Sequence, residues 1–367
     1  MKQLSSRRNL RSGYTTGACA SAAAYAALYR LLTGDIIEQV EVDLPRHGKI
    51  SIPVRGVILA DGRAVAEVIK DAGDDPDVTH GLSILSAVEL KDGPGIIIKG
   101  GCGVGKVTRP GLSVNVGEAA INPGPRQMIL SMVKKLLPMG KGAEIIISVP
   151  EGEKVAVKTL NPRLGIVGGI SILGTSGIVR PMSNQGYLNS LIPQLDQAVA
   201  MAQRLVILTP GEMGARKARD MGFPETAIIQ TSNFIGDMLR ECGERPIDKI
   251  ILLGHIGKII KVAAGIYNTH SKIADGRRET LAAHVAMLGA SPELIQEIMR
   301  LNTIEASLEL IRAHKLEGAY YSIADWSSRR CRELLPPTTV VGTIMYSLNG
   351  DIIAYDDQGL KLWEEKQ

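Results

Sequence analysis

The chain has 367 residues, of which 45% are hydrophobic and 22% charged, and a net charge of +4. These values predict a soluble globular protein of two domains. The mild positive charge suits an anionic small substrate, and aromatic residues, at 4%, are too scarce for a protein that stacks single-stranded nucleic acid on its rings.

The N-terminal segment is basic, but no apolar signal sequence follows it directly. Its basic residues are Lys2, Arg7, Arg8 and Arg11. The turn 13–17 then opens an Ala-rich apolar stretch, 18–32, with Thr15 or Thr16 placed to cap a helix. That stretch is too short to span a membrane and predicts a buried helix. We expect a cytoplasmic protein that binds neither membrane nor nucleic acid.

The four cysteines lie far apart in the sequence and show no zinc-ligand spacing. They are Cys19, Cys102, Cys242 and Cys331. We therefore expect no protein metal site and no disulfide, as is usual in a reducing compartment.

The first half, residues 1–181, is expected to form a mixed α+β domain. The predicted strands are 39–44, 50–58, 64–69, 95–99 and 143–149, and the predicted helices are 18–32, 82–90 and 128–137. An extended lead-in, 122–126, is expected before the last of these helices, and Arg126 near its start could serve an anionic ligand or be an ordinary surface arginine.

An acidic loop, residues 70–81, interrupts this pattern. Its ionisable side chains are Asp71, Asp74, Asp75, Asp77 and His80. Like charges this close repel unless something offsets them, so the loop could hold a cation, a donor-rich ligand or a proton-transfer geometry. The alternative is a solvated acidic turn. Because apolar runs flank the loop on both sides, we favour a functional role.

Two glycine-dense stretches, 100–105 and 161–177, follow. The first matches a dinucleotide fingerprint only loosely. Its glycines are expected to let the backbone approach a ligand or another backbone segment closely. In the second, we expect close backbone packing and a ligand-facing turn at 174–177.

The second half, residues 182–367, repeats a strand–loop–helix pattern three times, with strands at 205–208, 227–230 and 249–253. This pattern predicts a Rossmann-like α/β domain with a parallel sheet, in which ligands bind at the carboxyl ends of the strands. Residues expected to bind a ligand there are Thr209, Gly211, Glu212, Gly214, Thr231, Ser232, Asn233, Gly254, His255 and Lys258. Glu212 could accept hydrogen bonds from a ribose diol.

A polar stretch, 268–279, follows the third repeat. It carries His270, Lys272, Asp275, Arg277 and Arg278. A charge run is usually a solvated face, but the mixture of basic and acid–base groups favours binding. Residues 292–316 are predicted to be helical and 338–347 to form a closing strand.

Several of these segments, in the same order, resemble the CbiD family. They are 13–17, the acidic loop, 117–123, 164–177, 254–258 and 269–277. The resemblance covers nearly the whole chain, from about residue 10 to about residue 350. It implies a cobalt-precorrin-5B C1-methyltransferase of anaerobic cobalamin biosynthesis, with S-adenosylmethionine as methyl donor and cobalt-precorrin-6A as product. Cobalt would arrive within the tetrapyrrole substrate.

The chemistry of that reaction assigns roles to the residues above. Aligning a sulfonium donor with a carbon nucleophile is the main task, and a base can help by removing a proton from the macrocycle. His80 beside Asp77 is the first choice of base, and His255 and His270 are the alternatives. The groups expected to bind substrate are Thr15, Thr16, Asp74, Asp75, Arg109, Arg126, Lys258, Thr269, His270, Lys272 and Arg277. The basic side chains among them, Arg109, Arg126, Lys258, Lys272 and Arg277, are the expected clamps for carboxylate arms. Asp74 and Asp75 could instead lie near the cationic donor.

Two other functions compete with this interpretation. A nucleotide-dependent transferase or hydrolase would use the 100–105 loop for phosphates and the acidic loop for magnesium, although neither glycine-dense stretch matches a P-loop. A non-catalytic tetrapyrrole-binding protein would bind the macrocycle without donor turnover. A homo-oligomer and transient contacts with neighbouring pathway enzymes are also possible.

Overall fold

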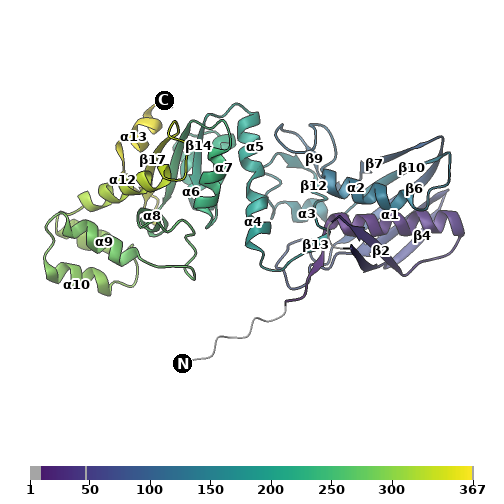
Figure 1. Ribbon diagram of the computed structural model, residues 1–367, viewed down its shortest axis with the longest axis horizontal. Helices are drawn as coiled ribbons and strands as arrows, with labels where there is room; N and C mark the ends of the chain where they lie inside the picture. Colours follow the sequence, from purple (N-terminus) through teal and green to yellow (C-terminus); the bar gives the residue numbers. More distant parts are fainter. Residues whose placement is uncertain (1–9, 46–47, 366–367) are drawn as a thin grey trace, which may run out of the picture. The chain divides into compact units, whose positions relative to one another are not determined.

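The computed structural model describes residues 10–45 and 48–365, so Lys2, Arg7 and Arg8 lie outside the described residues. The fold is mixed α/β (Figure 1). By their internal contacts the residues divide into two compact units, Met1–Tyr187 and Leu188–Gln367. The boundary predicted at residue 181 lies within the first of these units.

The first unit is built on a five-stranded sheet with the order β4-β5-β6-β10-β7. The strands are β4 (Gly56–Ala60), β5 (Arg63–Ile69), β6 (Ser83–Asp92), β10 (Lys141–Ser148) and β7 (Gly95–Gly100). Neighbours are antiparallel except β10 and β7, which are parallel. A separate hairpin pairs β2 (Gln39–Leu44) with β3 (Gly48–Pro53).

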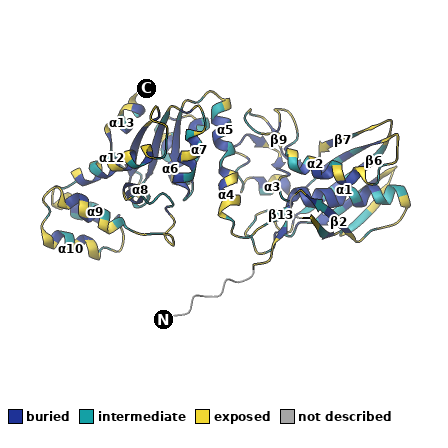
Figure 2. Cartoon of the chain, in the orientation of Figure 1, coloured by how far each residue is buried: buried dark blue, intermediate teal, exposed yellow. Residues whose placement is uncertain are grey.

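Helix α1 (Thr16–Thr33) is the buried centre of this unit, as its Ala-rich sequence predicts. The Thr15 hydroxyl caps it by accepting from the amide of Ala18, and Gly34, at a φ of 80°, ends it. It packs against β5, β6 and α2 (Pro123–Lys134). Figure 2 shows α1 largely in the colour of buried residues. Small alanine side chains let the helix lie close to the sheet.

Two predicted elements of this unit are wrong. The predicted helix 82–90 is a strand instead: residues 83–90 belong to β6, where alternate residues are buried and β5 and β10 pair on either side. The single strand predicted at 50–58 is two strands, because Pro53 ends β3 and the chain leaves its partner β2 before β4 begins at Gly56. In addition, α2 starts at Pro123, so residues 123–126 are helical and not an extended lead-in.

The glycine-dense stretches pack backbone against backbone. The pairs are β8 (Gly103–Val104) with β12 (Gly169–Ile170) and β9 (Lys106–Val107) with β11 (Ile166–Val167). A Cβ on Gly103 would lie 1.8 Å from the carbonyl oxygen of Val149, and one on Gly169 would lie 2.1 Å from that of Gly103. These glycines were expected to allow close approach either to a ligand or to another backbone segment. The contacts of Gly103 and Gly169 are with other backbone segments. Short elements nearby are β1 (Gly13–Tyr14), β13 (Ile178–Val179) and α3 (Gly152–Ala156).

The second unit contains a five-stranded sheet with the order β15-β14-β16-β17-β18. The strands are β15 (Ile228–Gln230), β14 (Leu205–Thr209), β16 (Lys249–His255), β17 (Val340–Tyr346) and β18 (Ile352–Tyr355). The first four are parallel and β18 is antiparallel. The three predicted strand–loop–helix repeats are confirmed, with helices α6 (Glu212–Asp220), α7 (Ile235–Gly243) and α8 (Ile256–Ala263). The strand predicted at 338–347 does not close the sheet, since β17 pairs on both sides.

Helices cover both faces of this sheet. Ile207 and Ile344 pack with Ala215 of α6 and with Leu362 of α13 (Asp357–Glu364) on one face. On the other face, α8 and α12 (Gly318–Arg332) contact β16 and β17. The remaining helical elements are α4 (Asn184–Leu191), α5 (Pro193–Ala200), the 3-10 turn η1 (Glu225–Ala227), α9 (Arg277–Ala286), α10 (Pro292–Arg300) and α11 (Ser307–Ala313). Across the described residues, no helix is both long and apolar enough to cross a membrane.

Candidate functional site

The carboxyl edge of the parallel strands in the second unit gathers many of the predicted ligand-binding residues. Strand β14 lies between β15 and β16 in the sheet. The chain therefore runs from β14 to β15 on one side and then returns past β14 to β16 on the other side, which reverses the direction in which strands are added. Such a reversal creates a crevice at the strand ends where ligands bind in open α/β sheets. The loops after β14 and β16 meet here, because a Cβ on Gly254 would lie 3.4 Å from the side chain of Pro210.

Lys258, Asn233 and Thr269 converge at this edge from three separate segments. The Lys258 ammonium donates to the Asn233 side-chain oxygen at 2.6 Å, and the Thr269 hydroxyl donates to the same oxygen at 3.3 Å. The Thr269 amide also donates to the Asn233 carbonyl at 3.0 Å. Burial, followed by the charge of Lys261, lowers the pKa of Lys258.

The loop that carries Thr269 continues through other predicted substrate-binding residues. His270 and Lys272 are exposed, and the His270 Nδ1 accepts from the Lys272 amide at 3.1 Å. Arg277 forms a two-point ion pair with Asp275, with N···O distances of 2.8 and 2.7 Å. This hydrogen bonding is the main reason that the pKa of Asp275 is held well below its usual range.

The predicted ligand-binding residues at and just after the C-terminal end of β14 differ in burial and in hydrogen bonding. The Glu212 carboxylate at the start of α6 accepts from Arg219 and, at 3.0 Å, from Gln230. Thr209 is fully buried, and within the described part of the chain its hydroxyl has no hydrogen-bond partner. That hydroxyl lies against Gly214, where a Cβ would be 1.7 Å from it, whereas Gly211 faces open space.

The adjoining loop after β15 brings Thr231 and Ser232 to the same edge. The Thr231 amide donates to the carbonyl of Thr209, the last residue of β14, at 2.8 Å. Ser232 adopts a φ of 54°, in the left-handed region that few residues other than glycine enter. This turn presents Asn233 to Lys258.

His255 caps helix α8. Its Nδ1 accepts from the Gly257 amide at 3.1 Å, and its Nε2 lies 2.8 Å from Glu305, which accepts the ring proton. The other Glu305 oxygen accepts from the amide of Leu348 at 2.8 Å. Both ring nitrogens of His255 are engaged, so it is poorly placed to take a proton from a substrate.

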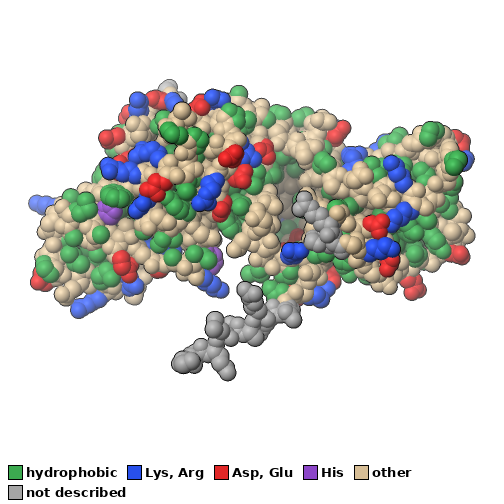
Figure 3. Space-filling model, viewed as in Figure 1, with side chains coloured by type: hydrophobic (Ala, Val, Ile, Leu, Met, Phe, Trp, Pro, Cys, Tyr) green, Lys and Arg blue, Asp and Glu red, His purple; other side chains and the backbone are tan. Residues whose placement is uncertain are grey.

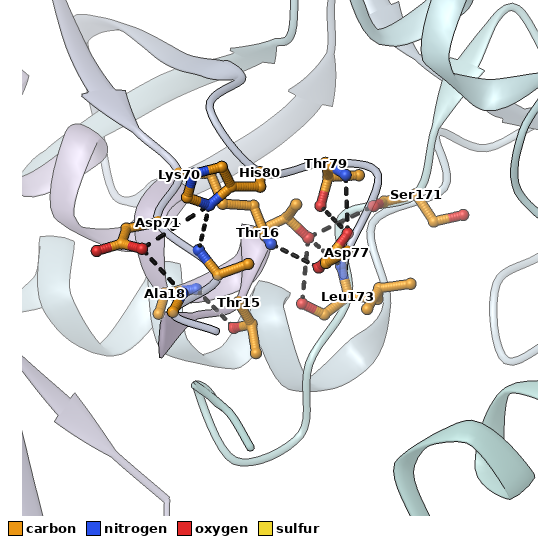
Figure 4. Close-up of polar contacts among 12 residues, drawn as sticks. Thr15, Thr16, Ala18, Lys70, Asp71, Asp77, Thr79, His80, Ser171 and Leu173 are labelled. Atoms are coloured by element: carbon orange, nitrogen blue, oxygen red, sulfur yellow. Dashed lines mark hydrogen bonds and ion pairs between the residues drawn. The ribbon is translucent and has the colours of Figure 1, made fainter. Parts of the chain in front are cut away.

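The acidic loop of the first unit is organised by Lys70, which the sequence analysis did not single out (Figure 4). Lys70 is 1% exposed, and its ammonium lies 2.6 Å from the Asp77 carboxylate, which also accepts from Thr79. Burial opposes ionisation of Asp77, but Lys70 and the Thr79 hydrogen bonds outweigh it and lower the pKa of Asp77. The signal available in the sequence was a lysine directly after a strand of alternating burial and just before four carboxylates.

His80 does not pair with Asp77, contrary to expectation. Its Nδ1 accepts from the amide of Ala72 at 3.1 Å and lies 3.8 Å from a carboxylate oxygen of Asp71. Asp77 is already occupied by Lys70. The carboxylate neighbour of His80 is therefore Asp71.

The other loop carboxylates fasten distant segments of the first unit. Asp71 forms an ion pair with the Arg11 guanidinium, and Asp74 accepts from the Arg11 amide at 2.7 Å. Asp75 accepts from the amide of Met182 at 2.9 Å. Among the described residues, no group of three or more His, Cys, Asp or Glu side chains could hold a metal ion.

The remaining predicted substrate-binding residues of this unit also have structural contacts. Thr15 caps α1, and the Thr16 hydroxyl accepts from the Leu173 amide at 2.9 Å (Figure 4). Arg109 donates to the carbonyl of Arg163 at 3.2 Å, and Arg126 donates to that of Ile98 at 3.3 Å. Because each guanidinium makes a single hydrogen bond to a backbone carbonyl here, most of its N–H donors can still bind other partners.

Comparison with known proteins identifies the family. The CbiD family profile matches residues 3–181, and the profile described as "CbiD, C-terminal domain" matches residues 268–357. A Moorella thermoacetica protein named cobalt-precorrin-5B C(1)-methyltransferase is 49% identical over 95% of this chain and 96% of its own length. A Desulfitobacterium hafniense protein of the same name is 45% identical over 99% of this chain and 94% of its own.

A solved structure is also similar. The crystal structure of a cobalamin biosynthesis protein (cbiD) from Archaeoglobus fulgidus is 32% identical, covers 74% of this chain and 84% of its own, and has a TM-score of 0.39. The two profiles and the nearly full-length relatives lead to one conclusion: this chain belongs to the CbiD family.

Proposed function

We propose that this protein transfers a methyl group from S-adenosylmethionine to C1 of cobalt-precorrin-5B, giving cobalt-precorrin-6A in anaerobic cobalamin biosynthesis. The observation that carries this proposal is similarity along almost the entire chain to relatives that bear the name of that activity. On the face drawn in Figure 3, the described acidic and basic side chains are interspersed over both units. A small polycarboxylate suits such a surface better than a nucleic acid, which needs a continuous basic stripe.

The reaction depends on aligning the methyl donor with the macrocycle and on excluding water more than on strong acid–base groups. When bound, the donor supplies a sulfonium whose leaving group is already activated. The protein's part is to hold the donor and the macrocycle carbon in line and to exclude water. A base that removes a proton from the macrocycle adds to the rate.

The donor pocket is proposed at the carboxyl edge of the second unit, which we regard as Rossmann-like. The fully buried Thr209 hydroxyl, without a partner among the described residues, and the open space around Gly211 fit a polar ligand at the β14 exit. The residues proposed to line the pocket are Thr209, Gly211, Glu212, Gly214, Thr231, Ser232, Asn233 and Gly254. Glu212 can accept from a ribose diol if Gln230 or Arg219 yields one carboxylate oxygen.

His80 is the preferred base. The His80 side chain is 54% exposed. A proton taken up at Nδ1 would displace the Ala72 amide, which donates to that nitrogen at 3.1 Å, and would then face the Asp71 oxygen 3.8 Å away. His255, with both ring nitrogens engaged, is better suited to positioning α8. Replacing His80 by Ala should lower the rate of methyl transfer by roughly 10²–10⁴-fold, the usual contribution of a general base.

The activity is tested by incubating the protein under anaerobic conditions with cobalt-precorrin-5B and S-adenosylmethionine carrying a ¹³C methyl group. Mass spectrometry should find one labelled methyl in the tetrapyrrole, at C1 by NMR, together with S-adenosylhomocysteine. Tetrapyrrole binding without label transfer would contradict the proposal and indicate a non-catalytic binder. Label transfer that requires added magnesium would favour the nucleotide-type site instead.

A further inference from the structure

We propose that Lys258, in the first turn of α8 and with the charge of Lys261 nearby, binds a carboxylate group of a ligand. Which ligand carries the carboxylate rests on the proposed function. The donor has one carboxylate on its amino-acid tail, and the macrocycle has several on its acetate and propionate arms. The group itself is the same in both.

Three cationic side chains gather at the start of α8. Lys258 lies in its first turn and Lys261 one turn further along. Arg277 reaches the same turn, because a Cβ on Gly257 would lie 3.9 Å from its Nη1 atom. The N-terminus of a helix is itself a region of positive potential, so cations are normally disfavoured there.

The two lysine charges are poorly compensated within the protein, whereas Arg277 already pairs with Asp275. The polar contact of Lys258 is the neutral Asn233 amide, and those of Lys261 are two backbone carbonyls, of Thr269 at 3.3 Å and Ala274 at 2.8 Å. Within the described residues, neither lysine forms an ion pair. The one carboxylate that influences Lys261, Asp275, is already paired with Arg277.

Burial makes this arrangement costly. Lys261 is 3% exposed and Lys258 is half-buried. Desolvation lowers the pKa of both lysines, and their mutual repulsion lowers that of Lys258 further. Partly buried charges need a partner, and a ligand anion would provide one.

A carboxylate fits the available donors. The His255 ring already occupies the Gly257 amide, so the ammonium of Lys258 would make the main contact, supported by the positive charge of Lys261. Charge-assisted bonds of this kind are short and about twice as strong as neutral ones. Lys261 acts as a positioning residue, since its two carbonyl bonds hold the loop 268–276 against α8.

The test is isothermal titration of the full-length protein and of Lys258→Met with three probes. These are S-adenosylhomocysteine, 5′-methylthioadenosine, which lacks the amino-acid carboxylate, and uroporphyrin, a tetrapyrrole polycarboxylate. Lys258→Met should weaken one carboxylate probe roughly tenfold or more, and Lys258→Arg should recover most of the loss. Lys361→Met, which removes an exposed lysine of α13, is the matched control and should bind as the wild type does.

The outcomes separate the two sources of carboxylate. Loss confined to S-adenosylhomocysteine, with 5′-methylthioadenosine unchanged, assigns the site to the donor. Loss confined to uroporphyrin assigns it to the macrocycle. Equal affinity of wild type and Lys258→Met for every probe that binds would overturn the proposal.

A further measurement keeps this proposal separate from the proposed function. If the wild type binds none of the three probes, its melting temperature is measured in citrate and in sodium chloride at equal ionic strength. A citrate-specific rise that Lys258→Met abolishes would support the carboxylate site while counting against the methyltransferase proposal. The same citrate response in both proteins would overturn the carboxylate site.

Discussion

At the scale of single residues, Lys70 determines what the acidic loop does. Four carboxylates in a short loop suggest a cation or ligand site, but each of them already has a protein partner within the first unit. Asp77 forms an ion pair with Lys70, and Asp71 forms one with Arg11. Asp74 accepts from the Arg11 amide, and Asp75 accepts from the Met182 amide. The loop therefore joins distant parts of the first unit, whatever further role His80 has.

The Lys70–Asp77 pair predicts a stability loss that depends on pH. Asp77→Asn leaves a buried ammonium without its counter-charge, which should reduce the free energy of unfolding by about 3 kcal/mol. Because the pKa of Asp77 is lowered from 3.8 in the folded state, the wild-type advantage is present above that value and is lost as the pH falls below it through the folded pKa. Urea unfolding followed by far-UV circular dichroism at several pH values measures the difference. A difference that does not change with pH would refute this account.

Gly103 predicts a second residue-scale effect. Its φ is 69°, and a Cβ would meet the Val149 carbonyl oxygen at 1.8 Å. Gly62 has a similar φ of 73° but faces open space, so Gly62→Ala should cost only the roughly 1–2 kcal/mol of the left-handed conformation. Gly103→Ala should cost at least about 2 kcal/mol more because the backbone must also move. Equal losses in urea unfolding would argue against close backbone packing here.

At the scale of elements, the sequence correctly predicted those helices and strands whose formation depends on residues close together in the chain. The Ala-rich helix, a threonine cap at Thr15 or Thr16, of which Thr15 is the one observed, and the three strand–loop–helix repeats follow from propensity, capping and periodicity. Strand β6 was missed because its sequence, with Ser86 on the buried side, lacks a clear alternation of apolar and polar residues. Its conformation depends on β5 and β10, which pair from elsewhere in the chain.

The cap of α1 provides an element-scale prediction. Thr15→Ala removes the hydroxyl that accepts from the Ala18 amide and should destabilise the first unit by about 1 kcal/mol. Thr15→Ser keeps the hydroxyl and should restore most of the loss. Both tryptophans, Trp326 and Trp363, belong to the second unit, so amide hydrogen exchange along α1 is the suitable probe. A Ser variant as unstable as the Ala variant would show that packing of the Thr15 methyl against Gly174, not capping, matters.

At the scale of the whole molecule, the sequence predicted which loops share an edge but not which side chains pair. Parallel topology alone brings the loops after β14, β15 and β16 together. That His255 caps α8 and pairs with Glu305, that His80 faces Asp71 and that Lys261 is buried depend on contacts between residues far apart in the chain. One sequence carries no direct record of such contacts.

The donor is proposed to bind in the second unit, but its positive charge would also suit the carboxylates of the acidic loop in the first unit. Hydrogen exchange of the full-length protein can separate these two locations. If the donor binds at the carboxyl edge of the second unit, S-adenosylhomocysteine should slow exchange in 209–214, 231–234 and 254–258, because ligand binding suppresses local opening. The acidic loop, 70–81, should be unchanged. The control is 5′-methylthioadenosine, which should protect 209–214 while leaving Lys258 and its neighbours less protected if the donor's carboxylate lies there. Protection confined to the acidic loop would place the donor in the first unit and remove the role proposed for Thr209.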